Sequence, residues 1–209
     1  MTAPDLLTPA AVLKARTADH HHRAERSTFQ RQMVSGRLAR TEYIRWLGQM
    51  LVVHQALERA FADRHIPARL AALMTPRRRR TPDLARDLEH FSSAAGASLA
   101  ATAAFASRID AWGSAGGAEL AGVLYVFEGS TNGGRHIARG VRRGYRLGDH
   151  GGTAFLDPYG EAQGERWVEF KEALDQAVDA RDLPAVIAGA ETTFDAVAAI
   201  GGELLATAG

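Results

Sequence analysis

Helical periodicity extends along almost the whole chain, and it limits the possible folds more than any other feature. Apolar side chains recur every three or four residues, as at Ile44, Leu47 and Leu51, and no segment alternates between apolar and polar residues for long. Only residues 122–127, GVLYVF, have a strand-like composition. We assign them to a helix, because alanine and leucine flank them and the pattern continues past the next glycines. The sequence therefore predicts one all-α domain over residues 1–209.

Helix boundaries are marked by local signals. Thr8 followed by Pro9 is typical of an N-cap and a first helical residue, and Thr41 followed by Glu42 is a second such start. A glycine-rich segment, 146–160, reads as an irregular connection. The predicted helices span about residues 9–27, 41–64, 82–91, 99–112, 117–145, 164–178 and 184–206.

Composition excludes several classes of site. The chain has no cysteine, which removes disulfides, thiolate metal sites and iron–sulfur clusters. The formal net charge of +1 favours no particular partner. The first residues lack a basic segment followed by a long apolar run, and we find no apolar run of membrane-spanning length. We therefore expect a cytoplasmic protein without a membrane or nucleic-acid partner.

Three consecutive histidines, His20 to His22, occupy the first predicted helix. A helix turns by about 100° per residue, so the three rings point in different directions. His20 and His21 border an inward stripe of small residues that includes Thr17, Ala24 and Thr28, whereas His22 points to solvent. Adjacent histidines cannot share a metal ion, which would need HxxxH spacing. The pattern fits either a hydrogen-bonded core histidine or a single axial ligand beside a flat surface.

Three glycines, Gly129, Gly133 and Gly134, interrupt an otherwise apolar helix. Each glycine lowers helix stability by about 1 kcal/mol relative to alanine, so the cluster indicates a structural or functional requirement. Gly129 and Gly133 share one face, and a bare face lets a flat ligand lie against the backbone. The same glycines permit a kink or a close helix crossing. A phosphate loop is disfavoured, because no strand precedes the segment and the GxxxxGK[ST] pattern is absent.

Four consecutive arginines, Arg77 to Arg80, lie between Pro76 and Pro82. Short runs of charge are usually solvated loops, and we favour that interpretation. The alternative is a docking surface for an acidic protein.

Together, the histidine and glycine segments resemble the heme oxygenase family. Residues 13–25, LKARTADHHHRAE, are similar to its proximal helix, and residues 129–134, GSTNGG, to its kinked distal helix. EFKEAL (169–174) and ETTFDAV (191–197) are similar to its last two helices, so the resemblance covers nearly the whole chain. YVFEGSTNGG (125–134) most resembles bacterial heme oxygenases encoded beside bacteriophytochromes. The implied fold is a single-domain helical bundle with heme between the proximal and distal helices.

The resemblance implies a role for each matching residue. His21 becomes the axial ligand of the heme iron, with Glu25 as the partner of its other ring nitrogen. Thr17 lies on the stripe beside the heme. Lys14 and Lys171 match positions that contact the heme propionates. The three glycines would lie over the distal heme face, where O₂ binds.

Three departures from the family pattern concern the distal side and the heme edge. Ser130 stands where the family usually has an aspartate that anchors water for proton delivery. His54 replaces a tyrosine of the same network, and is either its substitute or a buried, satisfied histidine. Asp175 replaces a propionate-binding arginine, so the position of the cleaved carbon is left open.

The implied activity is conversion of heme b, both substrate and cofactor, to biliverdin, carbon monoxide and ferrous iron. It would use O₂ and electrons from an external reductase, because the chain has no flavin or nicotinamide fingerprint. A ferredoxin- or flavodoxin-type donor could dock at Arg77–Arg80, and a bacteriophytochrome could receive the biliverdin.

Two other classes stay open. A non-catalytic heme carrier or sensor on the same fold is compatible with Ser130. A di-iron oxidase would need several inward carboxylates and a pair of Glu-x-x-His motifs, which the sequence lacks.

Overall fold

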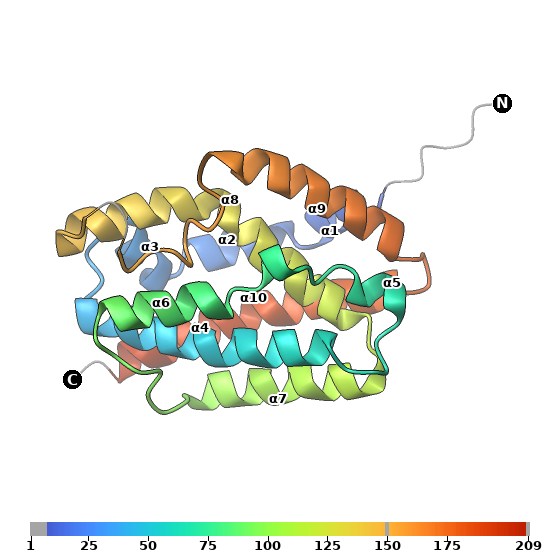
Figure 1. The fold of residues 1–209 in the computed structure, drawn as a ribbon, viewed down its shortest axis with the longest axis horizontal. Helices are drawn as coiled ribbons and strands as arrows, with labels where there is room; N and C mark the ends of the chain where they lie inside the picture. Colours follow the sequence, from blue (N-terminus) through green and yellow to red (C-terminus); the bar gives the residue numbers. More distant parts are fainter. Residues whose placement is uncertain (1–7, 149–150, 208–209) are drawn as a thin grey trace.

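The computed structural model describes residues 8–148 and 151–207, and every regular element in these ranges is helical (Figure 1). The expected all-α fold is confirmed. Its long helices are α4 (Arg40–Phe61), α7 (Ala100–Ala115), α8 (Glu119–Tyr145) and α10 (Leu183–Ala206). The shorter elements are α1 (Pro9–Arg16), α2 (Ala18–Glu25), α3 (Thr28–Val34), α5 (Ala68–Ala71), η1 (Pro76–Arg78), α6 (Thr81–His90), η2 (Gly160–Ala162) and α9 (Gln163–Ala177).

The core forms where the long helices pack side by side. α10 packs along α8, and α4 packs along α7 and α6. Gly122 of α8 and Gly189 of α10 allow the closest crossing, because a side chain on either would collide with the other helix's backbone. Large side chains such as Tyr43, Leu47 and Phe170 are fully buried in the core. Burial of this apolar surface is the main driving force for the bundle.

The N-terminal segment corrects the sequence expectation. A single helix over 9–27 was expected, but the structure has two helices that meet at Thr17. The Thr17 hydroxyl donates to the carbonyl oxygen of Leu13 at 2.8 Å, a competing bond that disturbs helices locally. The N–H groups of Thr17 and His21 still donate to carbonyls four residues back, at 2.9 Å each. The helical register is therefore kept across a local irregularity.

Helix α8 is hydrogen-bonded without interruption for 27 residues, yet its two halves run in different directions in Figure 1. The change of direction has a local cause. Three consecutive side chains donate to carbonyls three residues back: Ser130 to Phe127 at 2.7 Å, Thr131 to Glu128 at 2.6 Å, and Asn132 to Gly129 at 2.9 Å. Such bonds, together with neighbouring glycines, bend helices.

The connection after α8 is held by one buried carboxylate. The oxygens of Asp87 accept the N–H groups of Ala154 and Phe155 at 2.8 Å each. Burial raises the pKa of Asp87, and these two donors oppose the rise. The expected irregular connection over 146–160 is thus ordered from 151 onward, while its residues 149–150 lie outside the described residues.

From the sequence we expected no apolar run of membrane-spanning length, but α10 is long and apolar enough. Its length of 24 residues and a mean hydropathy of 1.4 over an 18-residue window would suffice by length and composition alone. In the fold it packs against α8, α7, α4 and α2, and it carries Glu191, Asp195 and Glu203.

Candidate functional site

Each of the three consecutive histidines has a different environment. Nδ1 of His20 lies 3.1 Å from an Asp195 oxygen on α10, so this ring nitrogen is engaged in a polar contact between α2 and α10. The side chain of His21 is 54% exposed, with its Nδ1 3.6 Å from a Glu25 oxygen and its ring edge-on to Phe194. His22 is exposed. His21 therefore offers a free Nε2 beside a carboxylate that can orient the ring.

The stripe of small residues is only partly realised. Thr17 is 3% exposed and its hydroxyl is bonded to Leu13, so it presents no polar atom to a ligand. Thr28, expected on the same stripe, instead begins α3 after Ser27, whose hydroxyl caps that helix. Ala24 remains half-buried on the α2 surface beside His21.

The glycines of α8 divide into two kinds. A side chain at Gly133 would meet nothing, and one at Gly129 would meet only the ring of Trp167 at 3.5 Å. A side chain at Gly134 would collide with the carbonyl of Leu156. Gly129 and Gly133 thus leave one helix face bare, whereas Gly134 serves close packing of the loop and does not face open space.

Ser130 is exposed, and its hydroxyl proton is already used by the carbonyl of Phe127. It can accept a hydrogen bond from water but has no free proton to donate. Its clearest structural effect is on the bend of α8.

His54 of α4 lies under the glycine segment and is only 2% exposed. Its ring lies between Phe127, with 4.4 Å between ring centroids, and Phe155, at 5.2 Å. Burial, with a smaller contribution from the charge of Arg80, lowers the pKa of His54 to about 3. The ring is therefore neutral near pH 7. Its buried Nε2 has no partner, so the alternative of a satisfied core histidine does not hold for that atom.

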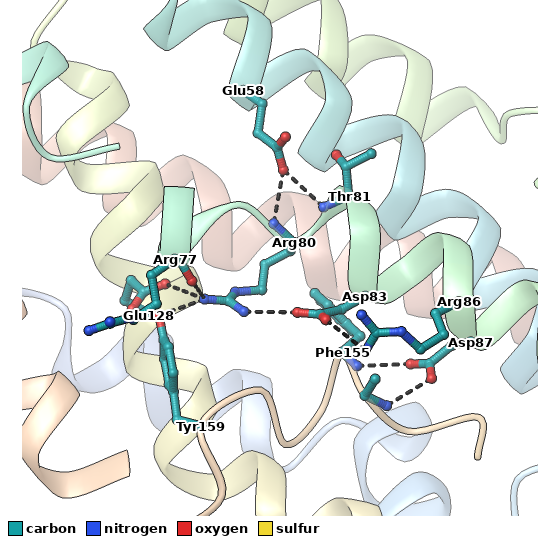
Figure 2. Close-up of polar contacts among 11 residues, drawn as sticks. Glu58, Arg77, Arg80, Thr81, Asp83, Arg86, Asp87, Glu128, Phe155 and Tyr159 are labelled. Atoms are coloured by element: carbon teal, nitrogen blue, oxygen red, sulfur yellow. Dashed lines mark hydrogen bonds and ion pairs between the residues drawn. The ribbon is translucent and has the colours of Figure 1, made fainter. Parts of the chain in front are cut away.

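A buried ionic network is centred on Arg80 (Figure 2). The charge of Arg80 acts on His54. Arg80 and Glu128 are 4% and 3% exposed, and a guanidinium nitrogen lies 3.7 Å from a Glu128 oxygen. Arg80 donates to the Tyr159 hydroxyl at 2.6 Å, and that hydroxyl donates to Glu128 at 2.8 Å. Arg80 also bonds Asp83 at 3.0 Å. Burial raises the pKa of Glu128, and Arg80 opposes the rise.

Sequence reasoning missed this network. Arg80 was grouped with the solvated basic loop, and Glu128 was read only as part of a motif. The available signal was a carboxylate inside the apolar run of α8, because a buried charge needs a partner. Within Arg77–Arg80 only Arg77 and Arg79 are exposed, and Arg78 donates to the Leu73 carbonyl at 2.7 Å. The expectation of a solvated loop is therefore wrong for Arg80.

Two lysines come from neighbouring helices. Lys14 is exposed on α1, and Lys171 is on α9, with its Nζ 5.8 Å from the centre of the Trp167 ring. α1 packs against α9, and Asp175 accepts the N–H of Ala10 at 2.7 Å. Asp175 therefore holds these two helices together at the start of α1.

The helix with His21 and the helix with the bare glycines share neighbours. α2 and α8 both pack against α3 and α10, and α1 and α8 both pack against α9. The exposed imidazole of His21, a bare helix face and two cations suit a flat, dianionic iron porphyrin. Among residues 8–148 and 151–207, no three His, Asp or Glu side chains gather as metal ligands.

Comparisons with known proteins agree with this geometry. The heme oxygenase family model matches residues 8–200. A heme oxygenase from Leptospira interrogans has a TM-score of 0.84 and 23% identity, over 94% of this chain and 99% of that one. Heme oxygenase-1 from Synechocystis, solved with heme, has a TM-score of 0.82 and 22% identity, over 94% and 92%. That from Neisseria meningitidis has 0.71 and 22%, over 97% and 94%. No curated protein sequence was found to match.

Proposed function

Because this chain belongs to the heme oxygenase family, we propose that it binds heme b and cleaves it to biliverdin, carbon monoxide and ferrous iron. The observation that carries the proposal is His21, an exposed imidazole whose Nδ1 faces Glu25 and whose Nε2 is free. Heme itself supplies the iron that activates O₂ and the ring that is oxidised.

The residues of the chain would hold and orient the substrate. Nε2 of His21 would ligate the iron, and Glu25 would accept a hydrogen bond from Nδ1–H and fix the ring orientation. Gly129 and Gly133 would let the porphyrin and a small iron ligand approach the α8 backbone. Lys14 and Lys171 would offset the propionate charges.

Proton delivery would rest on the buried polar groups under α8. The neutral His54 can donate and accept hydrogen bonds, and its unpartnered Nε2 is free to hold a water molecule. The neighbouring Arg80–Tyr159–Glu128 network supplies further donors. These groups would replace the aspartate that the family usually has at the position of Ser130.

A heme titration followed by a turnover assay tests the proposal. Wild type should bind one heme and, with a competent reductase and O₂, yield biliverdin and carbon monoxide. Absence of heme binding would contradict the proposal.

A second candidate is a heme carrier or sensor that binds without turnover. The hydroxyl of Ser130, already bonded to Phe127, favours it. Stoichiometric heme binding without carbon monoxide release would support this candidate over the first.

External partners are part of the proposal. The electrons would come from a ferredoxin- or flavodoxin-type protein in the cytoplasm, and biliverdin would supply a bacteriophytochrome. Co-expression with an apo-bacteriophytochrome should yield a covalently bound, absorbing bilin adduct.

A further inference from the structure

A cavity of about 610 Å³ lies between η1, the connection that follows α8 and the first turns of α9. It is separate from the proposed heme site, because none of the residues proposed to contact heme is among the described residues that line it. Its volume is in the range of pockets that hold small organic ligands, about 300–1,000 Å³. We call it the arginine pocket, after the lining residues Arg77, Arg78 and Arg166.

Positive charge predominates on the wall of the arginine pocket. Three guanidinium groups stand against one carboxylate, that of Glu169, so the lining residues carry an excess of two positive charges. Glu169 accepts from Arg166 at 2.6 and 2.7 Å, and the exposed Glu165 lies farther from it, at 3.8 Å. Arg77 and Arg78 form no ion pair with any residue that the structure describes. A concave surface with such uncompensated cations attracts an anion.

Two of the three guanidinium groups are held in place by the protein itself. Arg78 donates to the Leu73 carbonyl at 2.7 Å, and its guanidinium carbon lies 5.0 Å from the centre of the Phe170 ring. Arg166 is 22% exposed and is fixed by its bonds to Glu169. A guanidinium group has five N–H donors and can donate to two oxygens of one phosphate at once. Because these groups are already positioned, binding of an anion loses less conformational entropy.

Tyr159 gives the arginine pocket a neutral, aromatic wall. Its hydroxyl accepts from Arg80 at 2.6 Å and donates to Glu128 at 2.8 Å, as Figure 2 shows. Burial and the neighbouring Glu128 carboxylate raise the pKa of Tyr159, so the hydroxyl stays protonated and adds no negative charge to the wall. Together with Pro76, the ring offers apolar surface next to the cations. This combination suits a ligand with an anionic group and an organic part.

We propose that the arginine pocket binds the phosphate group of a small organic phosphate. A phosphate monoester carries a charge of about −1.5 to −2 near pH 7, which matches the excess charge of the wall. Inorganic phosphate presents the same chemistry but would fill only a small part of the cavity. The bound phosphate would link η1 to α9. The proposal needs neither heme nor O₂, so it goes beyond the proposed function.

Isothermal titration calorimetry of the full chain, with and without heme, tests the proposal. Phenyl phosphate and inorganic phosphate should both bind, and acetate at equal ionic strength should bind about tenfold more weakly or less, because it carries one charge. Tighter binding of phenyl phosphate assigns the pocket to organic phosphates, whereas equal affinities assign it to inorganic phosphate. Heme should change the phosphate affinity by less than about threefold, since it would occupy Lys14 and Lys171 and leave the arginine pocket open.

Matched variants locate the bound phosphate. Arg77→Gln with Arg78→Gln should weaken binding by about tenfold or more, because two charged donors are lost. The control, Arg139→Gln with Arg143→Gln, removes two exposed arginines of α8 and should change affinity by less than about threefold. Glu169→Gln should strengthen binding, since it removes the carboxylate from the wall.

Stability measurements separate loss of binding from loss of the fold. Thermal unfolding without phosphate checks each variant, because Arg78 also bonds the Leu73 carbonyl. Arg77→Glu changes only an exposed side chain and should weaken binding in the same direction. Phosphate should raise the Tm of wild type and of the α8 control, but not that of Arg77→Gln with Arg78→Gln. Equal affinities of the two double variants, or loss of phosphate binding on heme loading, would overturn the proposal.

Discussion

Single residues in this protein are distinguished by what their hydrogen-bonding atoms already touch. His20, His21 and His22 are adjacent in sequence, yet only His21 combines an exposed ring with a carboxylate at Nδ1. His20 has its Nδ1 engaged with Asp195. The proposed iron ligand is therefore distinguished by the exposure of its side chain, 54% for His21 against 20% for His20, because both rings have a carboxylate at Nδ1.

We predict that His21→Ala loses the iron–imidazole bond while His20→Ala and His22→Ala keep it. The Soret band and the axial-ligand signature in resonance Raman spectra report this directly. His20→Ala also removes the contact with α10, so it controls for a loosened α2. An unchanged ligand signature in His21→Ala would refute the assignment.

Stability at acid pH should depend on His54. The pKa of the folded state, about 3, lies below the unfolded value near 6.5, so the unfolded state binds more protons in this window. Stability is therefore complete above about pH 6.5 and is lost as the pH falls toward 3. The stability of His54→Leu should fall by roughly 2 kcal/mol less than that of wild type between pH 6.5 and 4.5. Urea unfolding of the heme-free proteins at both pH values measures this, and parallel losses would contradict it.

The same residue should affect turnover. His54→Ala should bind heme but slow biliverdin formation by roughly ten- to a hundredfold or more, the lower range for loss of a positioned proton-transfer group. Ser130→Ala should cost less, because its hydroxyl already bonds Phe127, and Ser130→Asp should be tolerated. Single-turnover absorbance records provide the rates. Wild-type turnover by His54→Ala would rule out its role in the proton path.

At the scale of elements, α8 shows why glycines of one cluster are not equivalent. Gly133→Ala should fold with wild-type stability apart from the helix propensity gain, because its added methyl meets nothing. Gly134→Ala should destabilise the protein by about 1–3 kcal/mol, because the methyl overlaps the Leu156 backbone. Chemical denaturation separates the two, and similar stabilities of both variants would contradict this account. For its small change in stability, Gly133→Ala should change heme affinity more than Gly134→Ala does, because Gly133 lies on the bare face of α8.

The sequence predicted the helical elements well because their apolar periodicity is local information. It failed at Thr17, where a side-chain hydroxyl competes for a backbone carbonyl within one helix. Sequence reasoning also grouped Gly134 with Gly129 and Gly133. The close contact that requires Gly134 is with the carbonyl of Leu156, a tertiary contact that the local sequence does not reveal. His21 and Glu25 were predictable from i,i+4 spacing alone. The partners of Arg80 were not, because burial of a charge depends on tertiary packing.

At the scale of the whole molecule, buried charges join segments that are distant in sequence. Arg80 contacts Glu128 of α8, Tyr159 of the following connection and Asp83 of α6. Glu58 of α4 accepts the N–H groups of Arg80 and Thr81 at 2.9 Å each, which caps α6 (Figure 2). The network thus ties three helices and a connection together directly beneath the bend of α8.

Loss of Arg80 should therefore weaken the whole fold. Arg80→Met should lower the free energy of unfolding by about 3–5 kcal/mol, because Glu128 is left buried without its cation. Arg80→Met combined with Glu128→Gln should recover part of this loss, since the amide can still accept from Tyr159 without carrying charge. Urea denaturation of the two single variants and the double variant completes a thermodynamic cycle. Strictly additive losses would show that Arg80 and Glu128 are not coupled.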